Sequence, residues 1–141
     1  MRSNWVALLM ALFLSLAPAA LASTTWYVDG VNGNDGNDCK STTTACKTIG
    51  HAISLAASGD SISVAAATYT ENLTINFSLN ITGSNASTTI IDGSGVATVI
   101  TIPFNSNARV TLSNLTIRDG FGLAGGIATS AGDPDDQPMR Y

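Results

Sequence analysis

From Ser61 onward, apolar residues alternate with small polar residues in short segments. Turn-forming Gly, Asn, Ser or Asp lies between most of the segments. The apolar positions are Ile62 and Val64, Leu73 and Ile75, Leu79 and Ile81, Ile90 and Ile91, Val99, Ile100 and Ile102, Val110 and Leu112, and Leu115 and Ile117. A period of two places one row of side chains inside and leaves the Thr, Ser and Asn side chains outside. The pattern predicts a series of short β-strands.

These segments also repeat. The tetrapeptide Asn72-Leu73-Thr74-Ile75 recurs 42 residues later as Asn114-Leu115-Thr116-Ile117. Offsets of about two turns of roughly 20 residues suit a solenoid in which each coil carries a few short strands. A β-sandwich would also show short strands and turns, but its strands are usually longer. The repetition favours the solenoid.

One stretch has helical rather than strand periodicity. In residues 48–58, Ile49, Ala52, Ile53 and Ala56 recur at helical spacing and form one apolar stripe. Thr48 can serve as the N-cap, and Gly59 provides a stop. We expect this helix to cover the open end of the first coil, where unpaired strand edges would otherwise invite aggregation.

The first 22 residues differ from the rest. Arg2 precedes an apolar run from Trp5 to Leu16, and Ala20-Leu21-Ala22 places small residues before Ser23. This is the pattern of a secretory signal peptide cut between Ala22 and Ser23, and the run is shorter than the roughly 20 residues of a transmembrane helix. We therefore expect export to the cell envelope or beyond it.

Both cysteines, Cys39 and Cys46, lie in the exported part. Two nearby cysteines in an oxidising compartment favour one local disulfide. A metal site has little support, because His51 is the only histidine and would complete at most three soft ligands. The segment 29–38 (DGVNGNDGND) is typical of turns, and calcium binding by it remains an alternative, although it does not match the EF-hand spacing.

Composition excludes several classes of function. Ten acidic residues against six basic ones provide no basic patch for nucleic acid. The scarcity of helix formers after residue 22 excludes a helical bundle. No Ser/His/Asp set is possible without His51, and no Gly-rich phosphate loop follows a strand. Four aromatic residues could either face a sugar or fill the core: Tyr69, Phe77, Phe104 and Phe121.

Several motifs together resemble a known family. They are Trp-Tyr-Val-Asp-Gly at 26–30, Asn-Gly-Asn-Asp-Gly at 32–36, Cys-Lys-Thr-Ile at 46–49, Gly-Asp-Ser-Ile-Ser-Val at 59–64, Thr-Tyr-Thr-Glu-Asn at 68–72, Ile-Asp-Gly at 91–93 and Leu-Thr-Ile-Arg-Asp-Gly at 115–120. Residues 25–127 resemble secreted bacterial repeat proteins with a right-handed parallel β-helix, the pectin-lyase-like fold, including polymorphic outer-membrane and adhesin-like members. Where that family has Gly before the Thr-Tyr turn, this chain has Ala67, so we expect a differently shaped turn.

The resemblance implies an all-β fold with a short capping helix and about three coils. The expected division is a signal peptide (1–22), an N-terminal cap with the disulfide and helix (23–59), β-helix coils (60–127) and a disordered or frame-shifted tail (128–141). The tail lacks alternation and contains two Pro and three Asp. We therefore expect the chain to be truncated, with further coils in its parent.

The class includes lyases, hydrolases and adhesins, so fold alone does not define activity. The resemblance to polysaccharide lyases makes Asp92, Asp119, Arg109 and Arg118 the candidates for catalysis. Each has a simpler interpretation, as a turn residue or as a solvent-facing residue beside a strand. We expect an exported structural or adhesin-like protein that binds carbohydrate or a cell-surface ligand, with no catalytic residue, metal or cofactor. The alternative is the N-terminal part of a polysaccharide lyase.

Overall fold

The structure is a computed structural model that describes residues 22–122 and 125–130. Most of its elements are short strands: β1 (Thr25–Val28), β2 (Ser61–Val64), β3 (Ala67–Thr70), β4 (Leu73–Thr74), β5 (Leu79–Gly83), β6 (Thr89–Asp92), β7 (Ile100–Pro103), β8 (Val110–Ser113), β9 (Thr116–Arg118) and β10 (Ile127–Ser130). One α-helix, α1 (Ile49–Leu55), and two 3₁₀ turns, Thr42–Thr44 and Phe104–Ser106, complete the described part. The predicted strand-rich body is confirmed.

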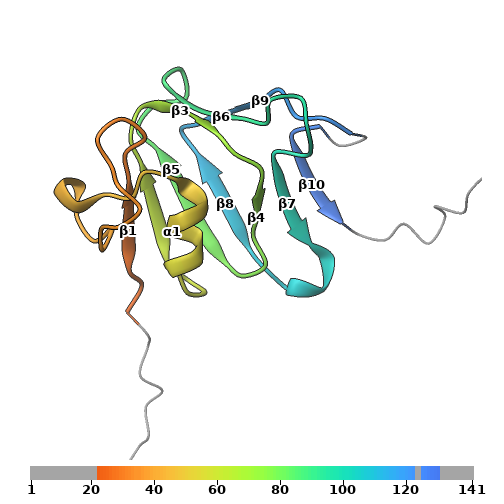
Figure 1. Cartoon of the computed structure of the whole chain (residues 1–141). Coiled ribbons are helices and arrows are strands. Elements are labelled where there is room, and N and C mark those ends of the chain that lie inside the picture. Colours follow the sequence, from red (N-terminus) through yellow and green to blue (C-terminus); the bar gives the residue numbers. More distant parts are fainter. Residues whose placement is uncertain (1–21, 123–124, 131–141) are drawn as a thin grey trace, which may run out of the picture.

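The strands form three sheets, and every strand pair in the described residues is parallel. The sheet orders are β1-β2-β5-β8, β3-β6-β9 and β4-β7-β10. From β2 onward the chain visits the three sheets in turn, three times over, so strands adjacent in sequence lie in different sheets (Figure 1). This arrangement is compatible with the predicted β-solenoid.

The core lies between the three sheets and follows the register of the strands. Ile62 of β2 pairs with Ile81 of β5, which pairs with Leu112 of β8, and the inward side chains therefore stack in rows. Ile81 and its neighbours in the middle of the stack are fully buried, whereas Leu112 is only half-buried. The last pass through the sheets thus leaves its apolar end partly open.

The helix α1 packs against β1 and β2 and buries Ile49, Ala52 and Ile53. The Thr48 side chain accepts a hydrogen bond from the amide of His51, which confirms the predicted N-cap. The helix ends at Leu55, three residues before the predicted Ser58. Ala56 has an extended backbone, and the Asp60 carboxylate accepts a hydrogen bond from the Ala57 amide at 2.9 Å. The chain therefore leaves the helix early.

The expectation of a differently shaped turn at Ala67 is wrong, because no turn is present there. Ala67–Thr70 forms strand β3, with Ala67 paired to Thr89, and Ala67 is not among the residues with positive φ. Tyr69 points inward with 3% of its surface exposed. The Tyr69 hydroxyl donates to Ala65 O and accepts from the Gly30 amide, which ties β3 to the loop after β1. A glycine is not needed where the backbone is an ordinary strand.

The expected signal peptide, apart from Ala22, and residues 131–141 of the expected tail lie outside the described residues. Residues 128–130, which were also expected in the tail, belong to strand β10 and pair with β7. Within the described part, none of the helical segments has the length and apolar character needed to cross a bilayer.

Candidate functional site

The outer surface of sheet β1-β2-β5-β8 carries two straight rows of polar side chains, which we call the polar face. The rows are Thr25, Ser61, Asn80 and Thr111, and Tyr27, Ser63, Thr82 and Ser113. Parallel strands lie about 4.8 Å apart, so the side chains in each row repeat at that spacing. Seven hydroxyl groups and one amide make up this surface, and none of its side chains is charged. It can donate and accept many neutral hydrogen bonds.

One pair of neighbouring hydroxyls on the polar face is joined by a hydrogen bond. Ser113 Oγ donates to Thr82 Oγ1 at 3.1 Å. Asn80 and Thr82 are exposed at the centre of the sheet, where β5 is flanked by β2 and β8. A rigid sheet holds these groups in fixed positions, which favours recognition of an extended polar ligand.

The disulfide cap lies along the edge of β1, at the end of that strand. Cys39 and Cys46 form a disulfide with a Cα–Cα distance of 5.0 Å, and both residues are fully buried. The predicted pairing is present in the structure. Backbone hydrogen bonds from Tyr27 N to Cys39 O and from Cys46 N to Tyr27 O fasten this loop to β1. Through these backbone hydrogen bonds the cap loop pairs with the edge of β1 and extends the sheet.

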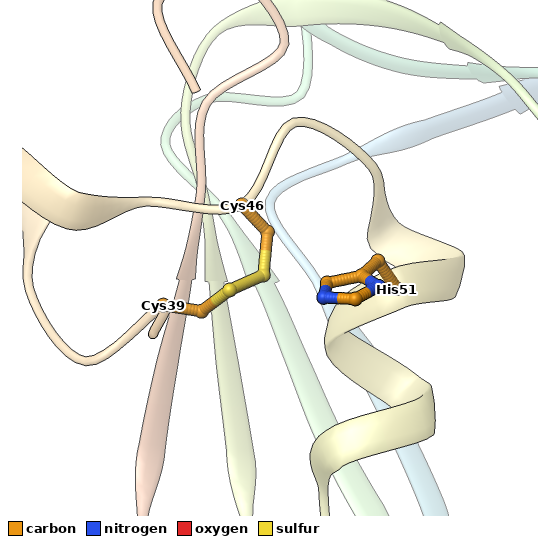
Figure 2. A group of neighbouring side chains, drawn as sticks. All are labelled: Cys39, Cys46 and His51. Atoms are coloured by element: carbon orange, nitrogen blue, oxygen red, sulfur yellow. A yellow bond between two sulfur atoms is a disulfide. The ribbon is translucent and has the colours of Figure 1, made fainter. Parts of the chain in front are cut away.

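His51 lies beside the disulfide, as Figure 2 shows. The two Sγ atoms and an imidazole nitrogen of His51 lie within 4.8 Å of one another, a grouping that reduced cysteines could use to hold a metal ion. In the disulfide both sulfurs are bonded to each other, and a metal needs the thiolate form. The arrangement present is therefore a packed brace between the loop and α1.

Carboxylates fix the start of α1. Asp35 accepts hydrogen bonds from the amides of Lys47 and Thr48 and from the Thr48 hydroxyl, at 2.8 to 3.0 Å. Glu71, between β3 and β4, accepts from the amides of Ile49 and Gly50 at 2.9 and 2.7 Å. The first free amides of the helix are thus satisfied by side chains from two other segments. The sequence placed Asp35 in a loop for which calcium binding was an alternative. In the structure its carboxylate instead bonds to Lys47 and Thr48 at the start of α1.

Among the residues that the structure describes, Asp60 is the one buried carboxylate, with 6% of its surface exposed. It accepts hydrogen bonds from Thr24 N, Trp26 Nε1 and Ala57 N at 2.8 to 2.9 Å. Burial raises the pKa of this carboxyl, but these donors, with the charge of Lys40, lower it by more, so the pKa lies below the ordinary 3.8. Sequence reasoning missed this residue, because its partners come from positions 24, 26 and 57.

This low pKa predicts an acid-sensitive cap. Because the folded-state pKa of Asp60 is below the unfolded value of about 3.9, its contribution to stability is full above that value and is lost as pH falls through the folded pKa. Asp35 has a lowered pKa for similar reasons: burial raises it and the hydrogen bonds from Thr48 and Lys47 outweigh this. We expect the denaturant midpoint to fall as the pH drops below about 3.9, the unfolded pKa of these carboxyls. The fall should be smaller in Asp60→Asn, and an equal fall in both proteins would contradict this role.

Three of the four lyase candidates come together at one corner of the stack. Arg118 Nε lies 2.9 Å from Asp92 Oδ2 and 3.4 Å from Asp119 Oδ2. Asp92 also accepts from the Ser94 amide, and this bond and the Arg118 contact lower its pKa. Arg109 lies elsewhere, just before β8, with its amide donating to Ser78 Oγ. The corner is an exposed ion-pair network. Within it, Asp92 also stabilises the turn after β6 by accepting the hydrogen bond from the Ser94 amide.

The aromatic candidates divide between core and surface. Tyr69 is buried, and Phe77 is partly buried against the core. Phe104 and Phe121 are 72% and 66% exposed. These two exposed rings lie outside the polar face, beside β7 and after β9.

The fold and cap define the class as a strand-rich protein of parallel sheets with a disulfide cap at one end. Residues 31–101 match the family described as "Protein of unknown function (DUF1565)", and the chain belongs to that family. The family is associated with repeats of the β-helix, pectin-lyase-like kind. No curated protein matches the sequence.

Proposed function

We propose that this chain is an exported protein that folds as a right-handed parallel β-helix and serves as a structural and binding surface at the cell envelope. The observation that carries this proposal is the polar face, with its two uncharged rows in register across four strands. The signal-peptide pattern and the buried disulfide support export, because disulfides persist in oxidising compartments.

The chemistry of the polar face favours a neutral, hydroxyl-rich ligand such as a carbohydrate polymer at the envelope or on a host surface. Hydroxyl and amide groups bind such a ligand through many weak hydrogen bonds, and no fixed charge on this face selects an ion. A regular spacing along the stack matches a ligand that also repeats.

Substitutions on the polar face provide the test. We expect the purified chain to be retained on insoluble peptidoglycan or cellulose, and the variant Ser63→Lys/Thr82→Lys to lose at least about tenfold in retention, because bulky charges would interrupt both rows. Thr68→Lys/Thr70→Lys is the matched control, since it adds the same charge at two exposed positions of a different sheet. Equal retention of the two variants, or no retention of the unaltered chain on either polymer, would contradict the proposal.

A second candidate function is the N-terminal part of a polysaccharide lyase. The Asp92, Arg118 and Asp119 corner is the observation that favours it. On polygalacturonate with calcium, a lyase would give a rise in ultraviolet absorbance that Arg118→Ala abolishes. We expect no such rise, because the guanidinium that would act as base is held by two carboxylates.

We also propose that further coils of a longer parent chain stack on the open end. The core positions of the last pass, Val110, Leu112, Leu115 and Ile117, are only partly buried, whereas Leu79, Ile81 and Ile91 of the preceding pass are at most 1% exposed. An additional coil would cover this apolar end and pair the edges of β8, β9 and β10.

A further inference from the structure

A pocket of about 270 Å³ opens where β1 begins, beside the turn between α1 and β2. It is lined by residues 22–24, Trp26 and residues 57–60. Asp60 is the one carboxylate among these lining residues, and its two oxygens face the start of β1 and the indole of Trp26. The pocket therefore contains both the Asp60 carboxylate and Ser23, the residue at which a processed chain would begin.

Asp60 has no cationic partner in contact with it in the described part of the chain. The ion pairs found there join Arg118 to Asp92 and Asp119. Lys40 lies close by, but its Nζ sits over the Trp26 ring, 4.1 Å from the ring centre. The Asp60 charge is balanced by three neutral N–H donors, which leaves it able to attract a further positive charge.

The backbone around Ser23 is held in place on this pocket. Ser23 Oγ donates to Gly59 O at 2.8 Å, and Thr24 N donates to Asp60 Oδ1 at 2.8 Å. Ser61 N donates to Thr24 O, which begins the pairing of β1 with β2. The nitrogen of Ser23 is one residue before the nitrogen of Thr24, so it lies within about 7 Å of the Asp60 carboxylate.

We propose that this pocket is a binding site for an α-ammonium group, and that its ligand is the ammonium of Ser23 released by cleavage after Ala22. The inference rests on the proposed export, because a leader peptidase must make the cut. Water adds across the Ala22–Ser23 amide, leaving a carboxyl group on Ala22 and an amine on Ser23 that takes up a proton at neutral pH. Loss of Ala22 also removes one wall of the pocket.

Processing then changes the charge of the site. Before cleavage the Ser23 nitrogen is a neutral amide, and after cleavage it is a cation close to Asp60. A nearby carboxylate favours the charged form, so the folded-state pKa of the amine rises above its unfolded value of about 7.7 to 8.0. With that sign, the added stability is full below about pH 7.7 and is lost as pH rises through the folded-state pKa. The mature chain is therefore more stable at neutral pH than the same fold without a charged amine at Ser23.

Three forms of the chain test the site. The first begins at Ser23 with a free amine, the second is the same chain acetylated at that amine, and the third begins at Leu21 and moves the ammonium about 7 Å farther along the chain. Residues 23–141 retain every described residue except Ala22. Lys40 is common to all three forms, so its contribution cancels.

The free Ser23 form should have an unfolding equilibrium constant about threefold smaller at pH 7 than either other form, as a rise of half a pKa unit gives. The difference should disappear by about pH 9.5, when the amine is neutral. Equal stability of the free and acetylated forms at pH 7 would overturn the inference, as would a difference that persists unchanged in Asp60→Asn. If Asp60→Asn does not fold, the acetylation comparison still decides.

The two proposals fail separately. Sequencing the amino terminus of the exported chain tests the cut itself, and a different first residue contradicts the proposed processing. The stability comparison uses a terminus made at Ser23 by design, so its result depends only on the pocket.

Discussion

Replacement of Ile81 by alanine should lower the free energy of unfolding by about 3 to 4 kcal/mol. Ile81 is fully buried at the centre of the core row between Ile62 and Leu112. Its neighbours belong to strands fixed on both sides, so the structure has little freedom to close the cavity. The loss is a large fraction of the total stability of a domain of this size. Denaturant unfolding followed by circular dichroism measures it.

The adjacent residue provides the control for this prediction. Asn80 is exposed on the polar face of the same strand, and Asn80→Ala should change the free energy of unfolding by no more than about 0.5 kcal/mol. If the two substitutions cost the same, the inward and outward assignment of β5 is wrong, since a shift of one residue would exchange the two faces.

Removal of the disulfide should cost about 2.5 kcal/mol, the loop-closure value for the eight residues from Cys39 to Cys46. Cys39→Ala/Cys46→Ala tests this without placing a hydroxyl in a fully buried site. The effect should be local to the cap, because this loop bonds to β1 and contacts α1 through His51.

Reduction of the unaltered protein by a dithiol is the matched comparison. It should give the same loss as the double substitution, whereas the double variant should not respond to the dithiol at all. A double variant as stable as the oxidised protein would show that the loop is held by its backbone hydrogen bonds alone.

The strand pattern could be predicted from sequence because its cause is local. Alternation at Ile62/Val64 and Leu79/Ile81 follows from the period of a strand, and Thr48 caps α1 through a contact three residues away. The strand β3 was missed because Ala67-Thr68-Tyr69-Thr70 has one large apolar residue, and its inward direction is set by Tyr69 contacts with Gly30 and Ala65. The early end of α1 depends likewise on a bond from Ala57 to Asp60.

The candidate sites divide in the same way. The Cys39–Cys46 pair is close in sequence and could be predicted, whereas the polar face requires the register of four strands whose paired residues lie up to 36 positions apart in sequence. Asp92 and Arg118 meet because their strands are paired, and their turn sequences alone carry no sign of that contact. Asp60 reads as an ordinary turn residue until Thr24 and Trp26 are placed beside it.

The central claim is that the chain is an exported scaffold closed by a disulfide. The most direct test is to express the chain with its own leader in a bacterium and to measure the intact mass of the recovered protein. Free thiols are blocked with an alkylating reagent before the measurement. The account predicts that the protein is found in the envelope or medium with the mass of residues 23–141. This mass should be lower by the two hydrogen atoms lost in the disulfide and should include no alkylating reagent. A full-length chain of 141 residues in the cytoplasm, with the reagent on both cysteines, would contradict it.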